Sequence, residues 1–277
     1  MTRTSAKRKR GEEEEIFDNA LEYKRPMAFV AFLLVSLLLV MGTFLNPSFM
    51  KQTIKTESNT VIISKQINSH FNRLTTIVNG NSDDENLLSD EQALEVADLI
   101  IDYKYGFHLI QTSDTALANQ IKQVILKSEK TDSSQVATVR KKLRKQKTSA
   151  TYIVANAFDL ATVLLEANLV TIIRLVAVIV IILCIVAIVS IFKEAFKSHT
   201  KRAVIHDLTA GLMWTAFWLM LIYGLMALVP IFFDTSVITA LDLGYWLEIA
   251  SGVFLNYVIV GAALYVISAI PWQVTSN

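Results

Sequence analysis

Residues 175–192 read LVAVIVIILCIVAIVSIF and contain no charged side chain. A helix of about 18 apolar residues, each rising about 1.5 Å, is long enough to cross the hydrocarbon core of a bilayer. Three further uncharged stretches, 27–50, 208–233 and 249–277, are at least as long. The sequence therefore predicts an all-α integral membrane protein with four transmembrane helices.

The composition agrees with a membrane location. The chain has 277 residues, of which 53% are hydrophobic and 18% are charged, whereas an average soluble domain is about 25% charged. Its 26 basic and 25 acidic residues leave a net charge of +1. These values exclude a soluble enzyme, a disordered chain and a free nucleic-acid-binding protein, and we expect no nucleic-acid partner.

The distribution of Lys and Arg predicts the orientation of the chain. Seven lie before the first predicted span, four lie in the loop 193–207, and none lies in the loop 234–245. Short loops on the cytoplasmic side of a membrane carry an excess of Lys and Arg. We therefore expect both termini and the loop 193–207 to be cytoplasmic, and the long segment between the first two spans to be extracytoplasmic.

The compartment follows from two absences in the sequence. The only cysteine, Cys184, lies within the second predicted span, so the external segment has no disulfide. That segment also has no N-glycosylation acceptor, because the proline in Asn46-Pro47-Ser48 blocks the only candidate. Both absences favour a bacterial cytoplasmic membrane.

The predicted segments are a tail 1–25, a span 26–48, an external domain 49–166, a span 167–192, a cytoplasmic loop 193–207, a span 208–233, an outer loop 234–245, a span 246–270 and a tail 271–277.

The external segment has the pattern of a helical bundle. Ile63, Ile67, Phe71, Leu74 and Val78 repeat at helical spacing and share one face. A capping box at 89–92 begins a second helix that Gly106 ends, and a weaker cap at 112–114 begins a third. A fourth begins at 131–134 and continues almost without a breaker into the second span. We expect four helices, of which the first and last continue from the flanking spans.

A cluster of six basic residues on the fourth helix is a candidate external binding surface for an anionic wall polymer or an acidic protein. The alternative is a solvated face balanced by the acidic stretch 83–91. The six residues are Arg140, Lys141, Lys142, Arg144, Lys145 and Lys147.

Two further groups of residues are candidates for contacts. Arg174, Glu248 and Asn256 are polar residues at or within the spans, and we predict that they form interhelix polar contacts. Ile16, Phe17 and Leu21 lie on a short amphipathic helix that follows the basic and acidic runs of the N-terminal tail. This helix is a candidate docking site for a cytoplasmic partner, or a plain interfacial helix.

Motifs of catalysis are missing from the sequence. It has no G-x-x-x-x-G-K-S/T phosphate loop, no G-x-S-x-G turn, no H-E-x-x-H pair and no Cys/His metal spacing. We therefore expect no enzymatic activity, no metal and no cofactor. An integral-membrane enzyme is the weakest alternative, because no acid, base or nucleophile set lies at one depth.

The sequence favours a non-enzymatic envelope protein whose external bundle binds a partner or cue and couples it to the cytoplasmic side. The expected partner is another membrane or envelope protein. The order of one span, a large external domain and three further spans resembles the layout of the permeases of the FtsX and MacB type. This resemblance implies the alternative of a membrane subunit in a transport or mechanotransmission complex.

Overall fold

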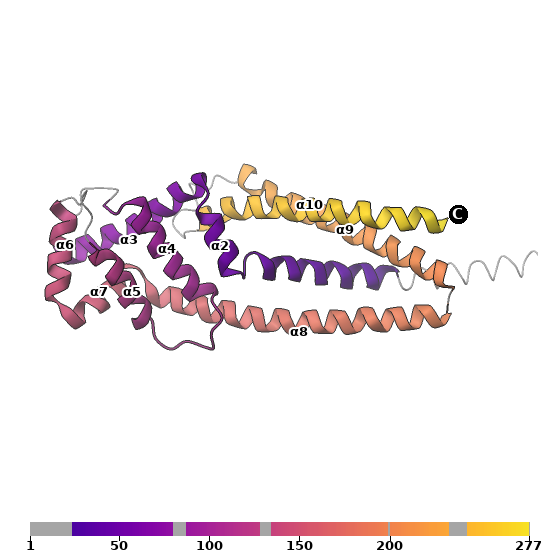
Figure 1. The fold of residues 1–277 in the computed structure, drawn as a ribbon, viewed down its shortest axis with the longest axis horizontal. Coiled ribbons are helices and arrows are strands. Elements are labelled where there is room, and N and C mark those ends of the chain that lie inside the picture. Colours follow the sequence, from indigo (N-terminus) through magenta and orange to yellow (C-terminus); the bar gives the residue numbers. More distant parts are fainter. Residues whose placement is uncertain (1–23, 80–86, 128–133, 199, 233–242, 277) are drawn as a thin grey trace, which may run out of the picture. The chain divides into compact units, whose positions relative to one another are not determined.

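The computed structural model describes residues 24–79, 87–127, 134–198, 200–232 and 243–276, and every regular element in these ranges is an α-helix (Figure 1). Four helices are long and apolar enough to cross a membrane: Lys24–Gly42, Leu160–Lys197, Lys201–Val229 and Ala250–Ser276. The prediction of an all-helical chain with four such helices is therefore confirmed. The chain divides into two compact units, Met41–Val176 and the combination of Met1–Val40 with Ala177–Asn277.

The Met41–Val176 unit is a bundle of short helices. They are α2 (Pro47–Ile54), α3 (Glu57–Asn79), α4 (Asp90–Tyr105), α5 (Thr115–Leu126), α6 (Ser134–Lys145), α7 (Lys147–Ala157) and the beginning of α8 (Leu160–Ser198). Their inward side chains form one apolar core, in which Phe71, Leu74, Leu117 and Ile121 are fully buried. Full burial of each such side chain contributes about 1.5–3 kcal/mol, so this core is the main source of the unit's stability.

Both boundaries of α4 agree with the sequence prediction, because local capping groups determine them. The Ser89 side chain accepts a hydrogen bond from Gln92 N, and α4 begins at the next residue, Asp90. The same helix ends before Gly106. A methyl group on Gly106 would lie 2.3 Å from the carbonyl oxygen of Asp102, so only glycine fits this backbone. The predicted apolar face of α3 is also found, since Ile63, Ile67, Phe71 and Leu74 are all buried.

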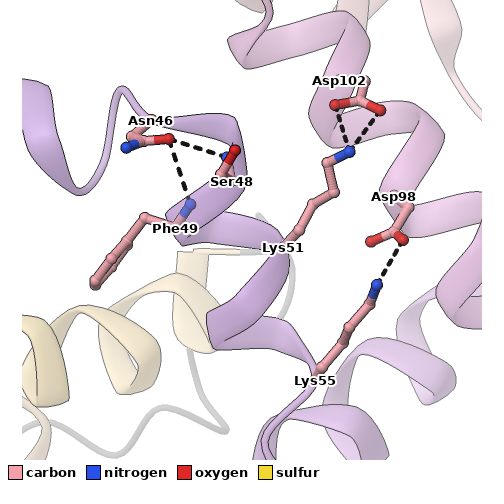
Figure 2. Close-up of polar contacts among 7 residues, drawn as sticks. All are labelled: Asn46, Ser48, Phe49, Lys51, Lys55, Asp98 and Asp102. Atoms are coloured by element: carbon pink, nitrogen blue, oxygen red, sulfur yellow. Dashed lines mark hydrogen bonds and ion pairs between the residues drawn. The ribbon is translucent and has the colours of Figure 1, made fainter.

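The prediction that the first helix of the bundle continues from the first span is wrong, whereas the last part of the predicted fourth helix, α8, does continue into the second candidate span. The first span ends at Gly42, and α2 begins at Pro47, with the Asn46 side chain accepting from Ser48 N and Phe49 N (Figure 2). Proline suits the first position of a helix, where no backbone donor is needed. The predicted fourth helix is divided into α6, α7 and α8. Asp159 lies between α7 and α8 with φ of 49°, in the left-handed region, which a right-handed helix cannot include.

Ion pairs join α2 to α4 across a long interval of sequence. Lys51 Nζ lies 2.7 Å from Asp102, and Lys55 Nζ lies 2.8 Å from Asp98 (Figure 2). The two lysines are one helical turn apart, and so are the two aspartates, so the pairs align the helices in one register.

The second unit is formed around α9 (Lys201–Phe232) and α10 (Leu243–Ser276), which pack along their length. The two helices approach closely at Gly261, where a methyl group would lie 2.9 Å from Met220 Cγ and 3.2 Å from the Ala216 carbonyl oxygen. Small residues allow such contacts between helices in a membrane. Tyr223 and Tyr257 add an edge-to-face ring contact with centroids 4.8 Å apart.

Candidate functional site

Three of the six clustered basic residues bind the ends of neighbouring helices. Arg140 Nε donates to Ile125 O at 2.5 Å, Arg144 donates to Leu126 O at 3.2 Å, and Lys142 donates to Val78 O at 3.1 Å. These carbonyls lie in the last turns of α5 and α3, where no intrahelical donor remains and the helix dipole is negative. The cluster therefore has a structural role.

The surface left for binding is smaller than the sequence indicated. Arg140 is only 3% exposed, so it cannot be part of the predicted external surface. Lys141, Lys142, Arg144 and Lys145 are exposed. The side chain of Lys147 lies outside the described residues.

Arg174 bonds to three carbonyl groups within the Met41–Val176 unit. Its guanidinium donates to Leu45 O at 2.7 Å, to Tyr105 O at 2.7 Å and to Gly106 O at 3.0 Å. One side chain of α8 thus fixes both the turn that precedes α2 and the C-terminal end of α4. A guanidinium has five donors in a planar fork, which is why it can serve three acceptors at once.

The loop after α4 is held by α8 and exposes apolar side chains. Gln111 N donates to Asn168 Oδ1 at 2.8 Å, Asn168 Nδ2 donates to Gln111 O at 2.9 Å, and Tyr103 donates to Ser113 O at 2.9 Å. Between these anchors, Phe107, Leu109 and Ile110 are 94%, 85% and 69% exposed. Large apolar side chains displayed by a fixed loop indicate an interaction surface.

Burial changes the titration of two tyrosines beside this loop. Burial raises the pKa of the Tyr105 phenol, and the negative charge of Glu166 raises it further, although Lys104 opposes both effects. Burial also raises the pKa of Tyr103, with a smaller contribution from the charge of Asp114. Lys104 and Glu166 form an ion pair at 2.7 Å, so the bond joins α4 to α8 next to Tyr105.

A polar groove of about 580 Å³ lies between α5 and α7. Lys122 Nζ donates to Asn119 Oδ1 and to Thr151 Oγ1, each at 2.8 Å, and Thr151 Oγ1 also donates to Asn119 Oδ1 at 2.8 Å. Asp114 and Tyr152 also line the groove, and the Tyr152 side chain is 80% exposed. The groove therefore combines an open aromatic ring with fixed donors and acceptors.

The remaining predicted residues lie apart from these features. Asn256 is exposed on α10 and forms no hydrogen bond with another described residue. Glu248 lies in α10, but its side chain is outside the described part of the chain. Ile16, Phe17 and Leu21 are outside the described residues altogether.

Sequence reasoning missed the groove and the apolar loop. Lys122 and Thr151 are 29 residues apart, and only the packing of α5 on α7 brings them together. The loop did carry a signal, because Phe107, Leu109 and Ile110 follow directly after a helix stop and have no helical partner face. Large apolar residues in such a position are typical of a surface contact rather than of a core.

The structure and the comparisons supply no catalytic precedent. Within the described ranges, no group of three or more His, Cys, Asp or Glu side chains is arranged to hold a metal ion. The chain matches no family model, no curated protein and no solved structure.

Proposed function

We propose that this chain is a non-enzymatic envelope protein of the bacterial cytoplasmic membrane, in which the external Met41–Val176 unit binds a partner and couples it to the cytoplasmic side. The groove between α5 and α7 is the observation that carries this proposal. In this groove an exposed ring, an amide, an ammonium group and two hydroxyls face a common space. The chain then acts as a sensor, a regulator or a scaffold.

The chemistry of the groove suits a polar partner with both donors and acceptors, such as a glycan or a peptide segment of the envelope. The ring of Tyr152 offers an apolar face. Asn119, Thr151 and Lys122 already bond to one another, so their positions are fixed before a ligand arrives. A fixed set of polar groups binds at a lower cost in conformational entropy than a mobile one.

The coupling step rests on α8. This helix runs for 39 residues from Leu160 to Ser198, and it passes from the partner-binding unit into the second unit without a break. Arg174 links α8 to the turn before α2 and to the end of α4, so a change at either place would act directly on α8. A rigid element with contacts at one end can transmit a displacement to the other.

The apolar loop with Phe107, Leu109 and Ile110 contributes a membrane contact to the proposed function. The external unit meets the outer leaflet where α8 enters the membrane, and Leu169, Ile172 and Ile173 of α8 are exposed apolar residues near the Asn168 anchor. Phe107, Leu109 and Ile110 extend this apolar surface into the leaflet.

A membrane subunit of a transport or mechanotransmission complex is the second candidate. The unbroken length of α8 favours it, because a mechanical subunit needs a stiff link across the membrane. Purification of the full chain in mild detergent separates the two candidates. A co-purifying ATPase supports the second, and an envelope protein without nucleotide hydrolysis supports the first.

The groove is tested by photo-crosslinking in intact cells. A benzophenone amino acid replaces Tyr152 in the full chain, and a matched variant carries it at Val61, which is 67% exposed on α3. We expect an adduct at position 152 that is lost when Asn119 is changed to Ala. Equal adducts at both positions, or none at 152, would refute the groove as the binding site.

A further inference from the structure

A second groove, of about 570 Å³, lies within the other unit, between the Lys24–Gly42 helix and α9. Its walls are mainly apolar and aromatic, and basic residues lie at one end. The volume falls within the range of roughly 300–1,000 Å³ that is common for small-molecule sites. The residues used below are Arg25, Phe29, Phe32, Trp214, Trp218 and Ile222.

Direct contacts between the two helices fix the shape of this groove. Thr215 Oγ1 donates to Ala28 O at 3.0 Å, and Thr215 is fully buried. The backbone of α9 comes close at Gly211, where a methyl group would lie 3.6 Å from Met27 Cγ. Lys24 and Asp207 form an ion pair at 2.9 Å at the same end of the helices. The groove is therefore bounded by a packed helix pair.

Among the described residues, the charge at the mouth of the groove is unbalanced. Lys24 is neutralised by Asp207, whereas Arg25 is exposed and has no ion-pair or hydrogen-bond partner among the described residues. Phe29 lies one turn further along the helix and Phe32 nearly two turns, about 10 Å from Arg25. On α9, Trp214, Trp218 and Ile222 follow one another at single-turn intervals. Phe29, Trp214 and Trp218 are 65%, 58% and 44% exposed.

We propose that this groove binds one anionic phospholipid. The phosphate lies at Arg25, whose guanidinium supplies donors and charge. One acyl chain runs along Phe29, Phe32, Trp218 and Ile222, which bury it and cover the exposed rings. A zwitterionic lipid would bring its own cation to the same place and would gain less from Arg25. Basic residues beside a span are the usual contacts of anionic headgroups.

The test uses the full chain in nanodiscs and the tryptophans of the groove as reporters. The chain has four tryptophans, and changing Trp246 and Trp272 to Phe leaves only Trp214 and Trp218. Phosphatidylglycerol or phosphatidylcholine with brominated acyl chains is then titrated into unbrominated phosphatidylcholine. We expect brominated phosphatidylglycerol to quench at about a fivefold lower mole fraction, the factor expected for one arginine near an anionic headgroup.

Three variants decide the role of Arg25. R25Q should abolish the preference for phosphatidylglycerol, and R25K should keep most of it. R202Q is the matched control, because Arg202 is an exposed base of α9 that does not line the groove, and it should leave the preference unchanged. Equal quenching by the two lipids in the unmodified chain, or an unchanged preference in R25Q, would overturn the proposal. Absence of quenching by either lipid would show that protein fills the groove and would also overturn it. None of these outcomes depends on which unit binds the external partner.

Discussion

Asn168 holds Gln111 by both of its backbone groups: the Gln111 amide donates to Asn168 Oδ1 at 2.8 Å, and Asn168 Nδ2 donates to the Gln111 carbonyl at 2.9 Å. The two residues are 57 positions apart, and one is in a loop while the other is in α8. A side-chain amide that pairs with a peptide group in this way replaces the hydrogen bonds of a regular element. The loop therefore has a fixed conformation without being a helix or a strand.

Changing Asn168 to Ala should release the loop. Both Gln111 groups lose their partner, and the unfolding free energy of the Met41–Val176 unit should fall by about 1–3 kcal/mol. Hydrogen exchange of a peptide covering 107–114 should become faster. Asn156→Ala is the control, because Asn156 is exposed on α7 and should change neither quantity. Unchanged exchange in Asn168→Ala would contradict the role of the clamp.

Changing Arg174 to Gln should destabilise the same unit through different carbonyls. The Gln side chain is shorter and has only two N–H donors, so at least one of the carbonyls of Leu45, Tyr105 and Gly106 loses its donor. We expect the melting temperature in detergent to fall, with a loss of about 1–3 kcal/mol for each unsatisfied carbonyl. Arg174→Lys should recover only part of it, because an ammonium lacks the planar fork. Full recovery in the lysine variant would show that charge alone matters.

The raised pKa of Tyr105 predicts a loss of stability at alkaline pH. The folded state holds the phenolic proton more tightly than the unfolded state, in which the pKa is near 10.0. The resulting stability is fully present below pH 10 and is lost as pH rises through the raised pKa of the folded state. Tyr105→Phe should flatten this decline in chemical unfolding measured from pH 8 to about 11. Tyr152→Phe, at an exposed ring, is the control and should decline like the unmodified chain.

The basic cluster should separate into a structural part and a surface part. Arg140→Met leaves the Ile125 carbonyl without its donor and should cost about 1–3 kcal/mol in unfolding free energy. Lys141→Gln with Lys145→Gln removes two exposed charges and should cost under about 1 kcal/mol. Only the second variant should reduce retention of the full chain on an acidic polymer across a salt series. Equal retention by that variant and the unmodified chain would exclude a polyanion-binding surface.

The sequence could predict the features that depend on nearby residues. The capping box at Ser89 and the stop at Gly106 are set within one or two turns, and the four apolar stretches need no tertiary information. The breaks on either side of α7 could not be predicted, because no glycine or proline marks Gln146 or Asp159. At Asp159 the chain leaves the helix in a left-handed conformation with φ of 49°, which residues other than glycine rarely adopt.

The site residues show the same limit. The six bases, five on α6 and Lys147 at the start of α7, form a visible cluster, yet the sequence does not reveal which helix ends lie opposite them. Arg140 faces inward because the last carbonyls of α5 lie within its reach, and its acceptor Ile125 is 15 positions away in the sequence. The groove at Lys122 and Thr151 could not be predicted for the same reason. Contacts between distant helices depend on the packing of the core.

The exposed loop should enter the outer leaflet of the membrane. Phe107, Leu109 and Ile110 are fixed by Asn168 and continue the exposed apolar face of α8, so their transfer from water into lipid is favourable at about 25 cal/mol per Å² of buried apolar area. A cysteine at Leu109 in a Cys184→Ala background, labelled with an environment-sensitive dye and reconstituted in liposomes, should show blue-shifted emission that brominated lipids quench. A cysteine at Val61, exposed on α3, is the control and should emit as in water. Emission at Leu109 that matches Val61 would place the loop in solvent, and its apolar side chains would then be left to bind a protein partner.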